Sequence, residues 1–379
     1  MAAAALSKRR KIAVWVLILL AALIGFVAAL TVWVQRQALE TDAWVNTSTK
    51  LLEDDEIRGA LSIYLVDQLY ANVDVAAELQ ASLPADVKPL AGPIAGGLRQ
   101  LSVRAADQLL SRPRVQALWE NANRKAHEAL LRIVEDKSKL VGTANGDVVL
   151  DLRPFIQQLG DQIGLGARLE QKLGPDAGKI VIMKSDQLDA AQKTVKIIKA
   201  LSIFIALVVL ALFVAAMYIA RGHRRETLRT IGVAMAIVGV LLLVVRRLAG
   251  NWIVDTLTNA QSVRTPAAHA WLISTDLLAG LAWTAIAYGV VLLLAAWLAG
   301  PTRPATWVRR ELAPSFRERA GAVYAVAGTL YLLVVLWGPT PAFRQPLWIL
   351  IFGGLIALGT EAFRRLTVRE FPAGAKPAH

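Results

Sequence analysis

Long apolar runs constrain this 379-residue chain more than any other feature of its sequence. One run lies near the N-terminus, at 12–34, and five more follow one another between 200 and 363. Runs of about 18 or more apolar residues are long enough to cross the hydrocarbon core of a bilayer as helices. The pattern predicts a mainly α-helical membrane protein with six transmembrane helices, arranged as one span, a polar segment and a bundle of five.

The distribution of charge favours a membrane over a nucleic acid as partner. Between residues 35 and 199 the chain has 21 Lys and Arg against 22 Asp and Glu, although the whole chain carries a formal charge of +13. The remaining 21 basic residues face only seven acids and cluster at the ends of the apolar runs. A nucleic-acid-binding protein concentrates its positive charge on a folded domain, so we expect the lipid bilayer and no nucleic acid.

The same basic residues predict the orientation in the membrane. With the N-terminus inside, the cytoplasmic segments hold 17 Lys and Arg, whereas the short outer loops hold four. Cytoplasmic segments are enriched in Lys and Arg, so both termini are expected in the cytoplasm, with the chain in a bacterial plasma membrane. The run at 12–34 is longer than the apolar region of a cleaved signal peptide, which indicates an uncleaved signal anchor.

These features divide the chain into four parts. Residues 1–34 form the basic cytoplasmic N-terminus and the first span, and 35–196 form an extracytoplasmic, mainly helical domain. Residues 197–363 form the five-span bundle, and 364–379 form a basic cytoplasmic tail. A helix is expected to continue from Ser185 without a break through the second span, because no helix breaker occurs before Arg221.

The external domain shows helical periodicity. Apolar residues recur three or four positions apart, as in the stripe of Ile94, Leu98, Leu101 and Leu109. We expect three or four amphipathic helices that bury such stripes against one another. The acidic run 53–56 is expected at a helix start, where the helix dipole favours negative charge.

Two short segments of the external domain depart from the helical pattern. Residues 147–152, which follow the turn signal Asn145-Gly146, and residues 179–183 have the composition of short strands. Residues 155–163 between them suggest a short helix. An isolated two-stranded ribbon is marginally stable. The sequence therefore predicts a small β-ribbon packed against the helices of the domain.

Motifs for catalysis are missing from the sequence. The chain has no Cys, which excludes disulfides and thiolate chemistry. Its four histidines show no metal-ligand spacing, and neither a nucleophile elbow nor a phosphate-binding loop occurs. We expect no enzymatic activity, no cofactor and no metal.

Two consecutive arginines are the main candidates for a functional site. Arg246 and Arg247 end the third apolar run, and charged residues near membrane depth are functional candidates. They could clamp an anionic group, pair with Asp255 or Asp276, or extend to the lipid headgroups. We favour the last interpretation, because the run is short and the pair lies at its outer end. These four residues form the candidate anion or partner site.

A second basic segment, 303–319, has Trp307, Leu312 and Phe316 among its arginines. This composition is typical of a helix that lies on a membrane surface. The segment could also dock a cytoplasmic protein partner.

Five segments carry a resemblance to a known family. They are Asp-Ala-Trp at 42–44, Trp-Glu-Asn-Ala-Asn-Arg at 119–124, Val-Val-Leu-Asp-Leu at 148–152, Lys-Ser-Asp-Gln-Leu at 184–188 and Arg-Gly-His-Arg-Arg at 221–225. Through them residues 41–250 resemble a family of uncharacterised multi-pass integral membrane proteins of actinobacteria and their relatives. That family has no assigned activity, so the resemblance implies a multi-pass membrane protein and transfers no functional residues.

Two functions fit these expectations. The first is a non-enzymatic protein of the bacterial cell envelope, whose external domain binds a partner or senses the cell-wall space. The alternative is the membrane subunit of a transport or export system, since the order of one span, external domain and five spans is similar to permease subunits of the ABC-2 exporter type. Against transport by this chain alone, the sequence shows neither broken helices nor an inverted repeat.

Overall fold

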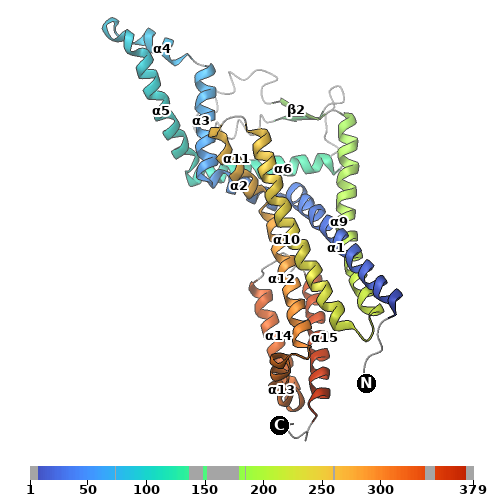
Figure 1. Ribbon diagram of the computed structural model, residues 1–379. Helices are drawn as coiled ribbons and strands as arrows, with labels where there is room; N and C mark the ends of the chain where they lie inside the picture. Colours follow the sequence, from blue (N-terminus) through green and yellow to red (C-terminus); the bar gives the residue numbers. More distant parts are fainter. Residues whose placement is uncertain are drawn as a thin grey trace. The chain divides into compact units, whose positions relative to one another are not determined.

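A computed structural model describes residues 7–72, 74–135, 148–151, 179–183, 185–258, 261–337 and 346–372, and helices dominate it (Figure 1). Contacts between residues divide the chain into two compact units. Unit 1 consists of Met1–Ala29, Ile205–Val244 and Leu278–His379. Unit 2 consists of Leu30–Phe204 and Val245–Leu277. The segment Val245–Leu277 is predicted to be part of the bundle but belongs to the same unit as the polar segment.

Four helices in the described part of the chain are long and apolar enough to cross a membrane. They are α1 (Lys8–Leu39), α9 (Ser185–Ile219), α10 (Arg224–Leu257) and α12 (Asp276–Leu298). The unbroken course of α9 confirms the prediction for that segment. Its apolar portion is Gln192–Ile219.

Three further helices follow α12. They are α13 (Arg303–Glu318), α14 (Ala320–Trp337) and α15 (Pro346–Glu370). The axes of α13 and α14 are bent by 112° at their junction, and the pair adds a fifth apolar helix if it is counted as one span. The described residues therefore contain four or five helices of membrane-spanning character, where the sequence predicts six.

Glycines allow α10 and α12 to approach each other closely within unit 1. A Cβ atom added to Gly239 would lie 2.5 Å from the carbonyl oxygen of Ala282, and one added to Gly232 would lie 2.8 Å from that of Gly289. Both distances are shorter than van der Waals contact. Backbones this close require residues without a side chain, as in many membrane helix pairs.

Unit 2 contains the helices of the polar segment between α1 and β1 (Val148–Asp151), together with α11. In chain order they are α2 (Thr41–Glu53), α3 (Asp55–Asn72), α4 (Val75–Ser82), the 3-10 helix η1 (Ala85–Leu90), α5 (Ala91–Leu110), α6 (Pro113–Val134) and, after α10, α11 (Gln261–Ser274). Asp54 caps α3, because its Oδ1 accepts hydrogen bonds from the backbone N–H groups of Glu56 and Ile57, each at 3.1 Å. The acidic run thus starts a helix, as predicted.

Helices α3 and α5 form an antiparallel hairpin. Arg58 Nε donates to Asp107 Oδ1 at 2.9 Å, and Arg99 Nε donates to Asp67 Oδ1 at 3.0 Å. Residues that lie far apart on α3 therefore pair in reverse order along α5. The buried positions between the two helices carry small or medium side chains, namely Ser62, Val66, Ala91 and Ala95.

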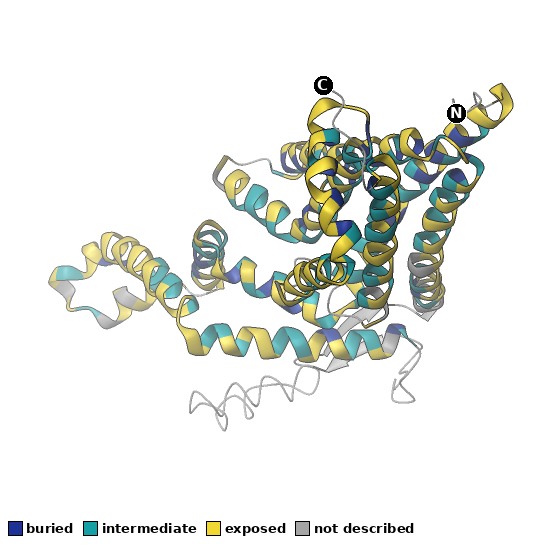
Figure 2. Ribbon diagram, turned by 90° about the horizontal axis from the view of Figure 1, so that it is seen from below, coloured by how far each residue is buried: buried dark blue, intermediate teal, exposed yellow. Residues whose placement is uncertain are grey.

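The apolar stripe of α5 corrects one expectation. The sequence predicts a buried stripe of Ile94, Leu98, Leu101 and Leu109, but the structure leaves all four exposed, Leu101 to 59%. The reason is that the small side chains on the adjacent face of α5 allow a closer approach to α3. Figure 2 shows that exposed and intermediate positions alternate along the helices, with buried positions in separate patches.

Two strands form the one sheet among the described residues. β1 (Val148–Asp151) pairs antiparallel with β2 (Lys179–Met183), and Leu150 lies opposite Ile180. The helix predicted at 155–163 lies outside the described residues. The packing of the ribbon on the helices of the domain stays a prediction.

Candidate functional site

Arg246 of α10 caps the C-terminus of α11. Its Nε donates to the Thr275 hydroxyl at 2.8 Å, and its Nη2 donates to the Leu272 carbonyl at 2.9 Å. Helix α11 ends at Ser274, so Leu272 belongs to the last turn, where carbonyls have no partner within the helix. A cation at this position also complements the helix dipole. The guanidinium therefore holds α11 rather than a neighbouring carboxylate.

Trp271 of α11 contacts α10 in return. Its indole Nε1 donates to the Arg246 carbonyl at 3.0 Å. The ring lies against Gly250, where an added Cβ would come within 2.4 Å of the indole nitrogen. Thr275, at the junction with α12, is 1% exposed. The C-terminal end of α11 is thus packed against α10, and the side chains of Arg246, Trp271 and Thr275 all have hydrogen-bond partners there.

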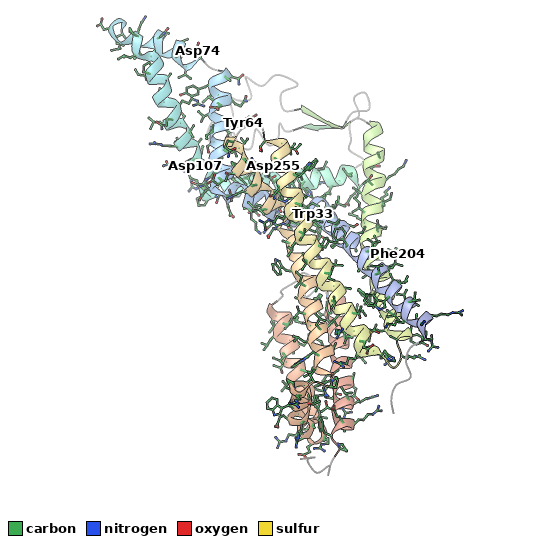
Figure 3. All side chains as sticks on the ribbon, in the orientation of Figure 1. Trp33, Tyr64, Asp74, Asp107, Phe204 and Asp255 are labelled. Atoms are coloured by element: carbon green, nitrogen blue, oxygen red, sulfur yellow. The ribbon has the colours of Figure 1, made fainter. Side chains whose placement is uncertain are left out.

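The remaining residues of the predicted site have separate environments. Asp255, labelled in Figure 3, pairs with Arg264 of α11, and Asp276 pairs with Lys50 of α2 at 3.0 Å. Arg247 is exposed, and no ion pair joins it to a described residue. Among the described residues, no hydrogen bond or ion pair connects any two of Arg246, Arg247, Asp255 and Asp276. The structure therefore does not join the four into a common clamp.

Changing Arg246 to Lys should lower the stability of the chain by about 1.5 kcal/mol, the lower end of the net contribution of one hydrogen bond from a charged group. A single ammonium cannot reproduce a planar fork whose nitrogens reach two different acceptors. Thermal unfolding of the purified protein in detergent measures the change. Arg247→Lys is the matched control and should leave the unfolding temperature unaltered. Equal shifts for the two variants would refute the capping role.

A contact between His269 and Asp54 completes this part of unit 2. His269 Nδ1 lies 2.9 Å from Asp54 Oδ2, and Asp54 also caps α3. Partial burial acts to raise the pKa of Asp54, but the His269 contact and the capping bonds outweigh it, so this pKa is lowered. Helix α11 is thereby tied to the start of α3, while Lys50 ties α2 to the start of α12. No spacing in the sequence signals either pair.

Helices α2 and α6 meet through two of the segments that carry the family resemblance. Arg124 Nη1 donates to Asp42 Oδ1 at 2.7 Å, and Trp119 Nε1 donates to the Ser48 carbonyl at 3.0 Å. The segments 42–44 and 119–124 therefore contact each other. The tryptophan and arginine of α6 have a structural role in positioning α2.

His127 of α6 connects the end of α1 with the start of α2. The ring is 3% exposed and stacks on Trp44, with centroids 5.1 Å apart. Its Nε2 lies 3.2 Å from the Ala38 carbonyl, which can only accept, so Nε2 carries the hydrogen. Nδ1 then accepts from the Thr41 hydroxyl at 3.1 Å. The neutral imidazole satisfies both groups at the junction of the two helices.

The environment of His127 predicts a loss of stability in acid. Burial lowers the pKa of this histidine below its ordinary value, despite the opposing contact with the Ala38 carbonyl. As the pH falls, the unfolded chain therefore takes up a proton on His127 at a higher pH than the folded chain does. The contribution of His127 to the free energy of unfolding is complete above about pH 6.5 and declines as the pH falls towards the folded-state pKa. Unfolding temperatures of wild type and His127→Gln between pH 8 and 5 test this. The variant should lose part of the pH dependence, and identical profiles would contradict the prediction.

A buried arginine organises one end of unit 1. Arg309 of α13 is 2% exposed, and its Nε and Nη2 form a bidentate pair with Glu370 of α15 at 2.7 and 2.9 Å. Its Nη1 donates to the Gly300 carbonyl at 2.8 Å and to the Leu298 carbonyl. Every branch of the guanidinium is engaged. One side chain thus joins the end of α12, α13 and the end of α15.

No group of three or more His, Asp or Glu residues in the described ranges is placed to hold a metal ion. A scan against models of protein families gives no match, and searches of curated proteins and of solved structures give none either. The function of the chain is therefore inferred from its own geometry.

Proposed function

We propose that this chain is a non-enzymatic, multi-pass protein of the bacterial plasma membrane, whose external domain binds a protein partner. In this proposal six helices span the membrane, both termini are cytoplasmic, and residues 35–196 lie outside. The long apolar helices support the membrane location. The excess of Lys and Arg in alternate connecting segments supports the orientation.

The observation that carries partner binding is an uncovered apolar face on the hairpin of α3 and α5. We call it the arm face and define it by Leu65 and Leu69 of α3 with Ile94, Leu98 and Leu101 of α5. These side chains are between 37% and 59% exposed. On each helix they lie beside the buried positions, and because the two helices run antiparallel, helical spacing puts both stripes on one side of the hairpin.

Large apolar side chains gathered on one face favour association. Covering apolar surface contributes about 25 cal/mol for each Å² removed from water. Single exposed leucines are ordinary, but a contiguous apolar patch marks an interaction site. Tyr64, labelled in Figure 3, is also exposed on α3, to 58%. The face has little charge of its own, so the partner surface is expected to be apolar.

Photo-crosslinking in living cells tests the proposal. A photoreactive residue at Leu101 should give a discrete crosslinked product, because this position belongs to the arm face. The same residue at Gln100 is the control, since neighbouring residues point about 100° apart around a helix. It should give no such product.

The mass of the product identifies the class of partner. A mass twice that of the chain indicates a second copy, and another discrete mass indicates a different protein. Equal crosslinking at Leu101 and Gln100, or none at either, would contradict a docking role for the arm face.

A further inference from the structure

Helix α13 presents a basic face with a tryptophan at its centre. Its inner side buries Ala305, Arg309 and Phe316. Arg303, Trp307 and Arg310 follow one another at spacings of four and three residues, which places them on one face of the helix. All three are exposed, Trp307 to 63%. We call these three residues the α13 outer face.

Arg303 and Arg310 of this face have no acidic partner among the described residues. Arg309 pairs with Glu370, and Arg364 and Arg365 of α15 both pair with Glu361. No ion pair joins Arg303 or Arg310 to any residue in the described part of the chain. Two guanidinium groups and an indole are thus available to a ligand outside unit 1.

The bend between α13 and α14 fits a helix that lies along a membrane. The two axes are bent by 112°, so α13 runs nearly crosswise to α14. If α14 crosses the bilayer, a crosswise helix at its end lies parallel to the membrane surface. The fixed contacts of Arg309 with Glu370 hold α13 in this direction.

We propose that the α13 outer face binds the phosphate groups of anionic phospholipids in the cytoplasmic leaflet, an inference that rests on the membrane orientation in the proposed function. The guanidinium fork matches phosphate oxygens bidentately. Tryptophan is enriched at the headgroup level, where its ring lies among apolar chains and its N–H reaches polar groups. Charge complementarity thus selects an anionic lipid over a zwitterionic one.

Native mass spectrometry of the purified full-length protein measures this binding. Phosphatidylglycerol is titrated against phosphatidylcholine, and retained lipids are counted. The Arg303→Gln/Arg310→Gln variant should bind phosphatidylglycerol about 25-fold more weakly, since a basic residue near an anionic surface contributes roughly a fivefold factor. Arg112→Gln/Arg114→Gln removes the same charge from exposed positions of the external domain, away from the cytoplasmic leaflet in the proposed orientation, and is the matched control. An equal loss in both variants, or no preference for phosphatidylglycerol in wild type, would overturn the proposal.

A second measurement keeps the arginines and so avoids any question of misfolding. The chain has no Cys, so Glu311→Cys, at an exposed position of α13, provides a unique site for a polarity-sensitive fluorophore. Its emission should shift to the blue in phosphatidylglycerol nanodiscs but not in phosphatidylcholine nanodiscs. The same emission in both would contradict lipid binding and leave the basic face to a cytoplasmic protein. Neither measurement involves the arm face, so its crosslinking result stands independently.

Discussion

Replacing Arg309 by Ala should destabilise the chain by about 3 kcal/mol, the lower end of the cost of leaving one partner of a buried ion pair uncompensated. The lower end applies because the Glu370 side chain keeps 34% exposure and so retains some hydration. The substitution also removes the donor from the Leu298 and Gly300 carbonyls at the end of α12. The end of α12, the middle of α13 and the end of α15 would lose their common contact.

The neighbouring residue provides the control for this variant. Arg310 is exposed and makes no ion pair with a described residue, so Arg310→Ala should change the unfolding temperature little. Both variants can be compared with wild type by thermal unfolding of the purified protein in a detergent without anionic lipid. Similar unfolding temperatures for Arg309→Ala and Arg310→Ala would show that the buried pair contributes nothing measurable.

Adding one methyl group at Gly239 should destabilise unit 1 by about 1–3 kcal/mol, the usual cost of overpacking. The new Cβ would lie 2.5 Å from the Ala282 carbonyl oxygen, which belongs to the backbone of α12 and cannot rotate away. The helices α10 and α12 must then separate and lose packing along their contact. Elsewhere in a helix the same change stabilises by up to about 1 kcal/mol, because Ala has the higher helix propensity.

Gly280 of α12 is the matched control, because a methyl group added there meets no neighbour. Nothing lies within 4 Å of a Cβ atom added there. Gly280→Ala should therefore leave the unfolding temperature unchanged or raise it, while Gly239→Ala lowers it. Finding the two substitutions equivalent would mean that the close approach of α10 and α12 does not contribute to stability.

Local signals in the sequence predict much of the secondary structure. The absence of breakers after Ser185 predicts α9, and the acidic run before Ile57 predicts the start of α3. Pro113 is the first residue of α6, where its fixed backbone angle and missing N–H are tolerated. Each of these features depends on residues a few positions apart. That is the range over which sequence patterns determine helix boundaries.

The partners of the polar side chains could not be predicted in this way. Lys50 and Asp276 are separated by 226 positions, and His269 and Asp54 are similarly distant, so only the tertiary fold brings them together. The periodicity of α5 indicates an apolar stripe correctly but does not say what covers it. Small residues on the adjacent face decide which side of α5 contacts α3.

The role of Arg246 differs between the sequence-based interpretation and the tertiary structure. Its position at the end of an apolar run favours contact with lipid headgroups or an anion. In the structure its guanidinium instead completes the last turn of α11. The sequence contains no signal for this role, because the end of α11 lies about 26 residues further along the chain.

The side of the membrane on which the helical domain lies is the central claim of the proposed function. Reporters that are active only outside the cytoplasm can be fused after Asn145 and after Pro301. The first fusion should be active, since Asn145 belongs to the external domain, and the second inactive, since Pro301 precedes the basic segment 303–319. The same activity state at both positions would contradict the account.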